Sequence, residues 1–344
     1  MFGKLVLFGS GETSPTGKKI HRKILQSFSQ KQNITILETP AGFQPNSHFV
    51  AEEIAKVFRQ SLLEFIYDVF IIPDNPDNLS ILKPLKQATY IFLGPGSPTY
   101  TVRQLQKTRT LQIMLDRWKN GATLCLSSAA AIAIGKYTLP VYEIYKTGSD
   151  LYWEKGLNIF QHVGLSFIVI THWNNKEGGE HLDTRYCYMG QERFAKLRKL
   201  LPKNTAILGI DEHTAIIFDF ENRIFSIEGV GTATLLKDKK KAVFNNGNYY
   251  MFDSFITFSP HVIQSPKKPI IKKRTVEYIT IKKYSLPKDL QVLLKQREKA
   301  KGEKDFTKAD EIRHLFEEKG YKIEDTKKEQ KVYKQTLSGQ GGQT

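Results

Sequence analysis

Two adjacent serines stand where a short apolar run gives way to small residues, within TLCLSSAAAIAIG. The apolar run predicts a buried strand and the alanines a helix, so the serines lie at the junction. A tight strand-to-helix turn can expose a serine hydroxyl as a nucleophile, and the next amide can bind an oxyanion. Ser128 lies at the turn with Ala129 after it, whereas Ser127 ends the strand. Close packing of a helix on a sheet is the competing explanation for these small residues.

A serine nucleophile needs a base within hydrogen-bond reach and an acid that orients this base. His172 directly follows the apolar run SFIVIT, so we expect its imidazole at the same sheet edge as Ser128. Asp211 and Glu212 end another predicted strand, and either carboxylate can orient His172. His213 is a rival base, which we expect to face solvent. The sequence leaves the choice between the two acids open.

Two glycines bracket a proline after a further apolar run, in FLGPGSPTY. Glycine lets a backbone amide approach a ligand closely, so Gly94 and Gly96 are candidates for a second oxyanion donor. An ordinary turn is the alternative. The segment GSGE near the N-terminus lacks the third glycine of a dinucleotide fingerprint, because Ser14 stands there, and no Walker A lysine pattern occurs. Two cysteines make neither a disulfide framework nor a tetrahedral zinc site. We therefore expect no cofactor and no metal.

Short β-rich runs alternate with amphipathic segments over the first 235 residues or so. This alternation, with several continuously apolar runs, predicts an α/β fold in which a parallel sheet has helices on both faces. Ligands then gather at the carboxyl ends of the strands, where all the candidate residues lie. The predicted strands are Lys4–Phe8, Ile34–Glu38, Phe65–Ile72, Thr89–Gly94, Thr123–Ser127, Ser166–Thr171, Ala206–Ile210, Thr214–Phe220 and Ile224–Gly229, and the clearest helices are His48–Leu62 and Gly190–Leu201.

Composition places the chain among globular proteins, with 40% hydrophobic and 11% aromatic residues in 344. No apolar run reaches the about 18 residues that a membrane helix needs, and the start reads as a strand rather than a signal peptide. The two cysteines suit a reducing cytosol, so we expect a cytoplasmic protein that does not contact a membrane.

Charge is unevenly distributed along the chain, whose formal net charge is +16. From residue 264 onward, 21 Lys and Arg face 12 Asp and Glu, a net +9, and the remainder carries +7. The excess suggests an anionic partner, nucleic acid first, with a solvated basic surface as the alternative. We predict a main domain over 1–262, a basic Pro- and Lys-rich linker over 263–286, a helical hairpin over 287–335 with a break near Gly302–Asp305, and a flexible tail over 336–344.

The order of these motifs resembles the cyanophycinase/dipeptidase E family of serine exopeptidases, whose fold is similar to class I glutamine amidotransferases. LSSAAA resembles the nucleophile turn G-x-S-A-G-A of the family, which implies Ser128 as nucleophile. GPG corresponds to its glycine-rich turn, and ITHW corresponds to its D-x-H-F sequence, which implies His172 as base. LGIDEHTAIIFD closely resembles its GIDExTA strand, and Arg193 lies where the family has an arginine-containing helix. The likeness spans roughly residues 3–235 and implies hydrolysis of a peptide or amide bond.

Several positions depart from the family pattern. Leu126 and Ala130 replace both elbow glycines, and Ile170 replaces the aspartate before the histidine. An inserted segment, Asn174–Met189, separates His172 from the arginine helix, and its polar groups either line a remodelled pocket or form a surface loop. The substrate specificity of the family is therefore not carried over. Our pocket candidates are Asn174, Asn175, Glu177, Asp183 and Arg193.

The C-terminal segment Leu293–Thr326 resembles the C-terminal end of cysteinyl-tRNA synthetases, in which K-D-F-x-x-A-D-x-I-R leads to G-x-x-x-x-D-T. The synthetase's catalytic motifs and zinc cysteines are absent, so the resemblance implies tRNA contact rather than aminoacylation. Tyr321 either stacks on an unpaired base or packs in a core. Phosphate contacts dominate affinity for nucleic acids, and the candidates are Lys295, Arg297, Lys299, Lys301, Lys304 and Arg313.

The sequence thus supports two hypotheses. The first is a serine hydrolase of a peptide or amide bond with a basic tail that binds RNA or tRNA. The second is a catalytically inactive, amidotransferase-like scaffold that binds tRNA or another partner. The substrate stays undefined, and a homodimer is left open.

Overall fold

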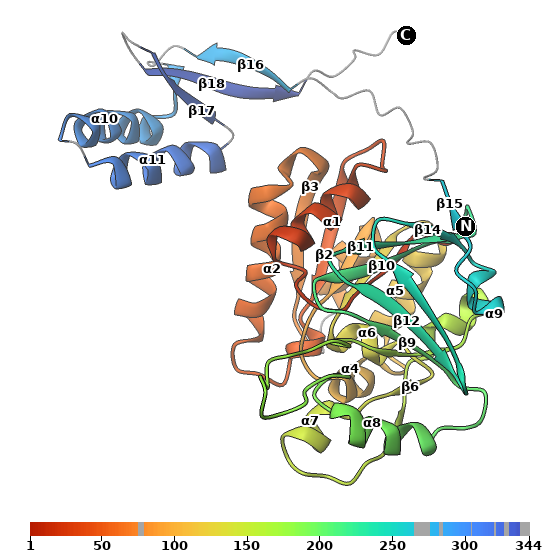
Figure 1. Ribbon diagram of the computed structural model, residues 1–344. Helices are drawn as coiled ribbons and strands as arrows, with labels where there is room; N and C mark the ends of the chain where they lie inside the picture. The colour runs from red at the N-terminus through yellow and green to blue at the C-terminus, as the bar shows by residue number, and fades with distance from the viewer. Residues whose placement is uncertain are drawn as a thin grey trace, which may run out of the picture. The chain divides into compact units, whose positions relative to one another are not determined.

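The structure is a computed structural model that describes residues 1–74, 79–264, 276–281, 285–303, 305–319, 321–326 and 330–337 (Figure 1). The chain divides into two compact units, Met1–Pro269 and Ile270–Thr344. The division falls inside the predicted basic linker. No helix within the described ranges is both long and apolar enough to cross a membrane.

The centre of the first unit is a nine-stranded sheet in the order β15-β14-β11-β10-β1-β5-β4-β2-β3. Strands β1, β5, β4, β2 and β3 are parallel, but β10, β11, β14 and β15 pair antiparallel. The predicted parallel sheet is therefore confirmed for the first five of these strands. The other four depart from it, and the turn between β10 and β11 is too short for a parallel crossover. The strand bounds are β1 Leu5–Phe8, β2 Gln32–Leu37, β3 Ile66–Ile72, β4 Tyr90–Leu93, β5 Thr123–Ser127, β10 Thr214–Asp219, β11 Ile224–Gly229, β14 Tyr249–Met251 and β15 Val262–Ile263.

A second sheet of four strands has the order β13-β12-β9-β8. This second sheet contains β8, the predicted strand that precedes His172. We had expected β8 in the sheet that carries Ser128, and this expectation was wrong. Only β8 and β9 pair in parallel here. Val169 and Leu208 face the core of the main sheet, whereas Ile168 and Ile170 pack in a separate cluster. The bounds are β8 Phe167–Ile170, β9 Ala206–Ile210, β12 Thr232–Lys237 and β13 Lys240–Asn245; a two-stranded ribbon joins β6 Tyr137–Thr138 and β7 Glu154–Lys155.

Helices cover both faces of the central sheet, as predicted. Alternate residues of β1 divide between the faces, with Val6 and Phe8 packed under α1 and α2, and Leu5 and Leu7 on the side of α3, α5 and α6. Side-chain caps fix several helix starts; Ser14, for example, accepts a hydrogen bond from Gly17 N. The bounds are α1 Pro15–Leu25, α2 Ser47–Ser61, α3 Lys83–Gln87, α4 Pro98–Leu105, α5 Arg109–Lys119, α6 Ala129–Ala133, α7 Val141–Tyr145, α8 Gly190–Lys199 and α9 Ser254–Thr257, with 3₁₀ turns at 39–41, 63–65, 79–82 and 159–163.

The second unit contains two helices and a three-stranded antiparallel sheet in the order β16-β18-β17. The helices α10 (Lys288–Gly302) and α11 (Phe306–Glu318) break where predicted, and Asp305 Oδ1 accepts from Lys308 N at 3.0 Å. A helical hairpin alone was the wrong expectation, because β16 (Val276–Ile281) lies in the predicted linker and β18 (Gln330–Leu337) extends into the predicted tail. These strands and β17 (Tyr321–Asp325) complete the unit. Its core contains Leu286, Leu290, Leu294, Ile312, Phe316, Ile323 and Val332.

Candidate active site

Ser128 occupies a strained turn between β5 and α6. Its backbone angles are φ 50° and ψ −114°, a left-handed conformation that a residue with a Cβ adopts only when its surroundings impose it. Strand β5 is held between β1 and β4, and Ser128 N donates to Phe8 O at 3.1 Å. The turn forms without the elbow glycines, because the side chains of Leu126 and Ala130 lie in the hydrophobic core. The sequence therefore builds this tight strand-to-helix turn from residues other than glycine.

Ser127 points the other way, into the protein. Its side chain is fully buried, and its Oγ donates to Glu12 Oε2 at 2.7 Å. Glu12 is itself only 8% exposed, so this pair lies beneath the turn and out of reach of a substrate. Of the two serines, only Ser128 lines the pocket described below.

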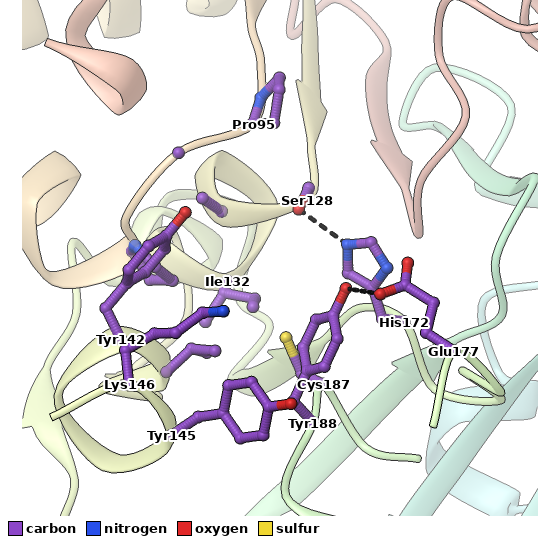
Figure 2. A pocket seen from close by; sticks show the side chains of 14 residues that line it. Pro95, Ser128, Ile132, Tyr142, Tyr145, Lys146, His172, Glu177, Cys187 and Tyr188 are labelled. Carbon is purple, nitrogen blue, oxygen red and sulfur yellow. Dashed lines mark hydrogen bonds between the residues drawn. The ribbon is translucent and has the colours of Figure 1, made fainter. Parts of the chain in front are cut away.

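His172 joins Ser128 to a carboxylate. Its Nε2 lies 2.9 Å from Ser128 Oγ, and its Nδ1 lies 2.8 Å from Glu212 Oε1 (Figure 2 draws the first of these). A carboxylate cannot donate, so Nδ1 carries a proton toward Glu212 and, in the neutral ring, Nε2 accepts from the Ser128 hydroxyl. His172 N also donates to Gly9 O at 3.3 Å, which connects the end of β8 to the end of β1. The side chains predicted for one sheet edge thus meet although two sheets carry them.

The structure brings Glu212, not Asp211, to the histidine. Asp211 Oδ2 instead accepts from the backbone N and Oγ1 of Thr232, at 2.8 and 2.9 Å, so it fastens a turn. The hydrogen bond from His172 lowers the pKa of Glu212, although partial burial opposes this. His213 is exposed, and its backbone N donates to Ser10 Oγ at 3.3 Å.

The inserted segment folds against His172 and Glu212 rather than forming a free surface loop. Asn175 is 1% exposed, and its Nδ2 donates to Glu212 Oε1 at 2.9 Å. Asn174 Oδ1 accepts from Glu212 N at 2.8 Å. Three consecutive residues, 186–188, adopt left-handed backbone conformations, and the amides of Tyr186 and Cys187 donate to the carbonyls of Trp173 and His172. The two asparagines therefore hold Glu212 in place, and neither lines the pocket described below.

A pocket of about 350 Å³ opens in front of Ser128 and His172 (Figure 2). Gly96 and Ala129 line it, but Gly94 does not; a Cβ at Gly94 would meet Ile54. Gly96 has φ 150°, and a Cβ there would lie 1.7 Å from Pro40 O, so only glycine fits this turn. Glu177 lines the pocket, whereas Arg193 and Asp183 are exposed and do not. The full lining is Pro95, Gly96, Pro98, Ser128, Ala129, Ile132, Val141, Tyr142, Tyr145, Lys146, His172, Glu177, Cys187 and Tyr188.

Tyrosines and opposite charges give the pocket its chemical character. Tyr188 Oη donates to Glu177 Oε2 at 2.7 Å, and burial with this carboxylate raises the pKa of Tyr188. Burial raises the pKa of the Cys187 thiol to about 12, so the thiol stays protonated at neutral pH. Sequence reasoning missed Tyr142, Tyr145 and Lys146, because the short segment VYEIYK carries no spacing that marks a site.

Some basic residues of the second unit that we predicted to contact nucleic-acid phosphates are engaged within the protein. Arg297 is 2% exposed, and its guanidinium bonds Asp325 twice, each time at 3.0 Å. Lys301 Nζ reaches the same carboxylate at 2.9 Å. We therefore correct the prediction that Arg297 contacts phosphate, because it holds α10 to β17. Lys295 and Lys299 are exposed, Arg313 lies 3.5 Å from Asp310, Lys304 lies outside the described residues, and Tyr321 packs beside Phe316.

Two family models match separate parts of the chain. Peptidase family S51 matches residues 5–224, and the cysteinyl-tRNA ligase anticodon binding domain matches residues 284–332. No curated protein matches the chain.

Solved structures resemble the first unit. A peptidase from an acI-B1 Actinobacterium aligns with a TM-score of 0.59 and 23% identity, over 73% of this chain and 98% of its own. A putative peptidase E from Listeria monocytogenes EGD-e aligns with a TM-score of 0.46 and 16% identity, over 71% and 99%. At this level of identity the first alignment supports the fold.

Proposed function

Because the chain belongs to peptidase family S51, we propose that it is a serine hydrolase that cleaves a peptide or amide bond. The observation that carries this proposal is the continuous hydrogen-bond path from Ser128 through His172 to Glu212, at 2.9 and 2.8 Å. Such a path is what a serine needs to become a nucleophile at neutral pH. The strained backbone at Ser128 supports the same role, since strain of this kind concentrates at functional sites.

The reaction proceeds through an acyl-enzyme. Ser128 Oγ attacks the carbonyl carbon, and its proton passes to Nε2 of His172, while Glu212 stabilises the imidazolium. The carbonyl oxygen becomes an oxyanion, for which the amides of Ala129 and Gly96 are the donors we assign. His172 then gives the proton to the leaving nitrogen as the carbon–nitrogen bond breaks. Water attacks the acyl-enzyme by the same route and restores Ser128.

The second unit adds a nucleic-acid function to this proposal. Its match to an anticodon binding domain and the net charge of +9 beyond residue 263 both support tRNA as the partner. Exposed Lys295 and Lys299 are the contacts we assign to phosphate. In the rival function, the second unit still binds tRNA, but the first unit is a scaffold without catalytic activity.

Two measurements on the full chain test these functions: the first separates the hydrolase from the inert scaffold, and the second tests the tRNA partner that both share. A set of dipeptides and amino-acid amides is incubated with wild type and with Ser128→Ala, and released amine is quantified. We expect release only with wild type; equal release from both proteins would exclude Ser128 as nucleophile. Filter binding of total tRNA at several salt concentrations tests the second unit. Affinity that is independent of salt would argue against phosphate contacts.

A further inference from the structure

The pocket presents a cation and an anion on opposite sides of the nucleophile. Figure 2 shows Lys146 near Tyr142 on one side and Glu177 beside His172 on the other. Among the described residues, the Lys146 ammonium lies 5.2 Å from the centre of the Tyr145 ring, and no carboxylate pairs with it. Glu177 accepts one hydrogen bond, from Tyr188, and retains further lone pairs. A substrate that satisfies both residues carries an ammonium group and an anionic group.

Aromatic rings form much of the remaining wall. Tyr142, Tyr145 and Tyr188 line the pocket, and Phe43, which is 41% exposed, lies edge-on to Tyr142 at 5.6 Å. Tyrosine faces stack on any nucleobase and need no specific hydrogen bond to do so. A dipeptide offers an ammonium to Glu177 and a carboxylate to Lys146 but leaves the rings without a group to stack on. A nucleotide supplies a base for the rings and a phosphate for the lysine.

From these features we infer that the substrate is an aminoacyl-tRNA and that the bond cleaved is the ester at its 3′ end. This inference goes beyond the proposed cleavage of a peptide or amide bond, because the bond is an ester, and it rests on the same activated serine. The pocket volume of about 350 Å³ lies at the small end of ligand sites and suits the terminal aminoacyl nucleoside rather than a folded polymer. The match to an anticodon binding domain supplies an independent reason for tRNA as the carrier.

Each group of the pocket then has a task. Glu177 binds the α-ammonium, Lys146 binds the phosphate that precedes the terminal nucleoside, and the tyrosines stack on its base. Ser128 Oγ forms a bond to the ester carbonyl carbon, the bond from this carbon to the ribose oxygen breaks, and His172 protonates that oxygen. Water then hydrolyses the acyl-enzyme, which releases the free amino acid and leaves intact tRNA.

The experiment measures release of radiolabelled amino acid from aminoacylated total tRNA. Fluorophosphonate labelling of Ser128, in the same preparations, counts the active sites. We expect wild type to exceed spontaneous hydrolysis by at least about tenfold and Ser128→Ala to equal it. Lys146→Met should raise KM about tenfold, the effect of losing one charge-assisted contact, with little change in kcat. Lys199→Met, an exposed lysine on α8, is the matched control and should keep the wild-type KM.

The ammonium contact is tested with N-acetylaminoacyl-tRNA. Wild type should cleave the free aminoacyl ester faster than the acetylated ester, and Glu177→Gln should abolish this preference. If fluorophosphonate labels Ser128 but neither ester is cleaved above the spontaneous rate, this inference is wrong and the serine hydrolase stands. If Ser128 is not labelled and nothing is cleaved, the proposed function itself fails. Cleavage that persists in Ser128→Ala overturns the inference as well.

Discussion

Replacing Ser128 with glycine should stabilise the fold relative to replacing it with alanine. The turn holds a residue with a Cβ at φ 50° and ψ −114°, a conformation that glycine adopts without steric cost. Both variants lose the same hydrogen bond to His172, so their comparison isolates the backbone. The Ser128 side chain does not cap α6, and neither variant removes a cap.

The size of the difference follows from two opposing effects. A non-glycine residue in such a conformation costs about 1–3 kcal/mol, and alanine retains this cost. Glycine is more flexible in the unfolded chain, which lowers the free energy of unfolding by about 0.4–1 kcal/mol. The free energy of unfolding of Ser128→Gly should therefore exceed that of Ser128→Ala by about 0.5–2 kcal/mol. For a unit of this size, each kcal/mol shifts Tm by about 2–4 °C.

Thermal unfolding of the full chain, followed by near-ultraviolet circular dichroism, measures this difference. The first unit holds most of the aromatic side chains, so its transition dominates the signal. We expect the glycine variant to melt higher than the alanine variant, and both to be inactive. A glycine variant that melts at or below the alanine variant would refute the claim that the turn is strained.

The other predictions concern the acid, the second unit and its basic surface. Hydrogen bonding lowers the pKa of Glu212 in the folded protein. The ionised carboxylate therefore stabilises the fold fully at pH values above its unfolded pKa of about 4.5, and this stabilisation is lost as pH falls through the folded pKa. The difference in free energy of unfolding between wild type and Glu212→Gln should shrink below pH 4.5, which urea unfolding at several pH values measures. Arg297→Met should destabilise the second unit by about 2–3 kcal/mol and speed hydrogen exchange in β17 and β18. This is below the usual cost of breaking a buried ion pair, because Asp325 is 41% exposed. The control Lys299→Met, at an exposed site, should change the free energy of unfolding by less than about 0.5 kcal/mol. Lys295→Met should reduce the slope of log affinity against log salt for tRNA by about 1, and an unchanged slope would remove this lysine from the interface.

The strand-end argument predicted which side chains meet, but not which sheets carry them. Ser128 and His172 each follow a buried strand, and this was visible as an apolar run before a polar residue. The choice between Asp211 and Glu212 depended on Thr232, which β12 brings beside the turn. No local pattern contains that information, because it arises from pairing between distant strands.

Burial of Arg297 could have been predicted more closely. Arg297 follows Leu290 and Leu294 at helical spacing, so periodicity already placed it on the apolar face of α10. A buried cation on such a face needs an anionic partner, and that partner, Asp325, lies on a strand that sequence reasoning did not predict. The sequence could not predict that Tyr142, Tyr145 and Lys146 line the pocket, because tertiary packing alone brings them there.

Labelling with a fluorophosphonate probe, read by intact mass and peptide mapping, tests most directly whether Ser128 is an activated nucleophile. Wild type, Ser128→Ala and His172→Ala are treated side by side at neutral pH. We predict a single adduct on wild type, located at Ser128, none on Ser128→Ala, and greatly slowed labelling of His172→Ala. Wild type that remains unlabelled, or an adduct that persists in Ser128→Ala, would contradict the account.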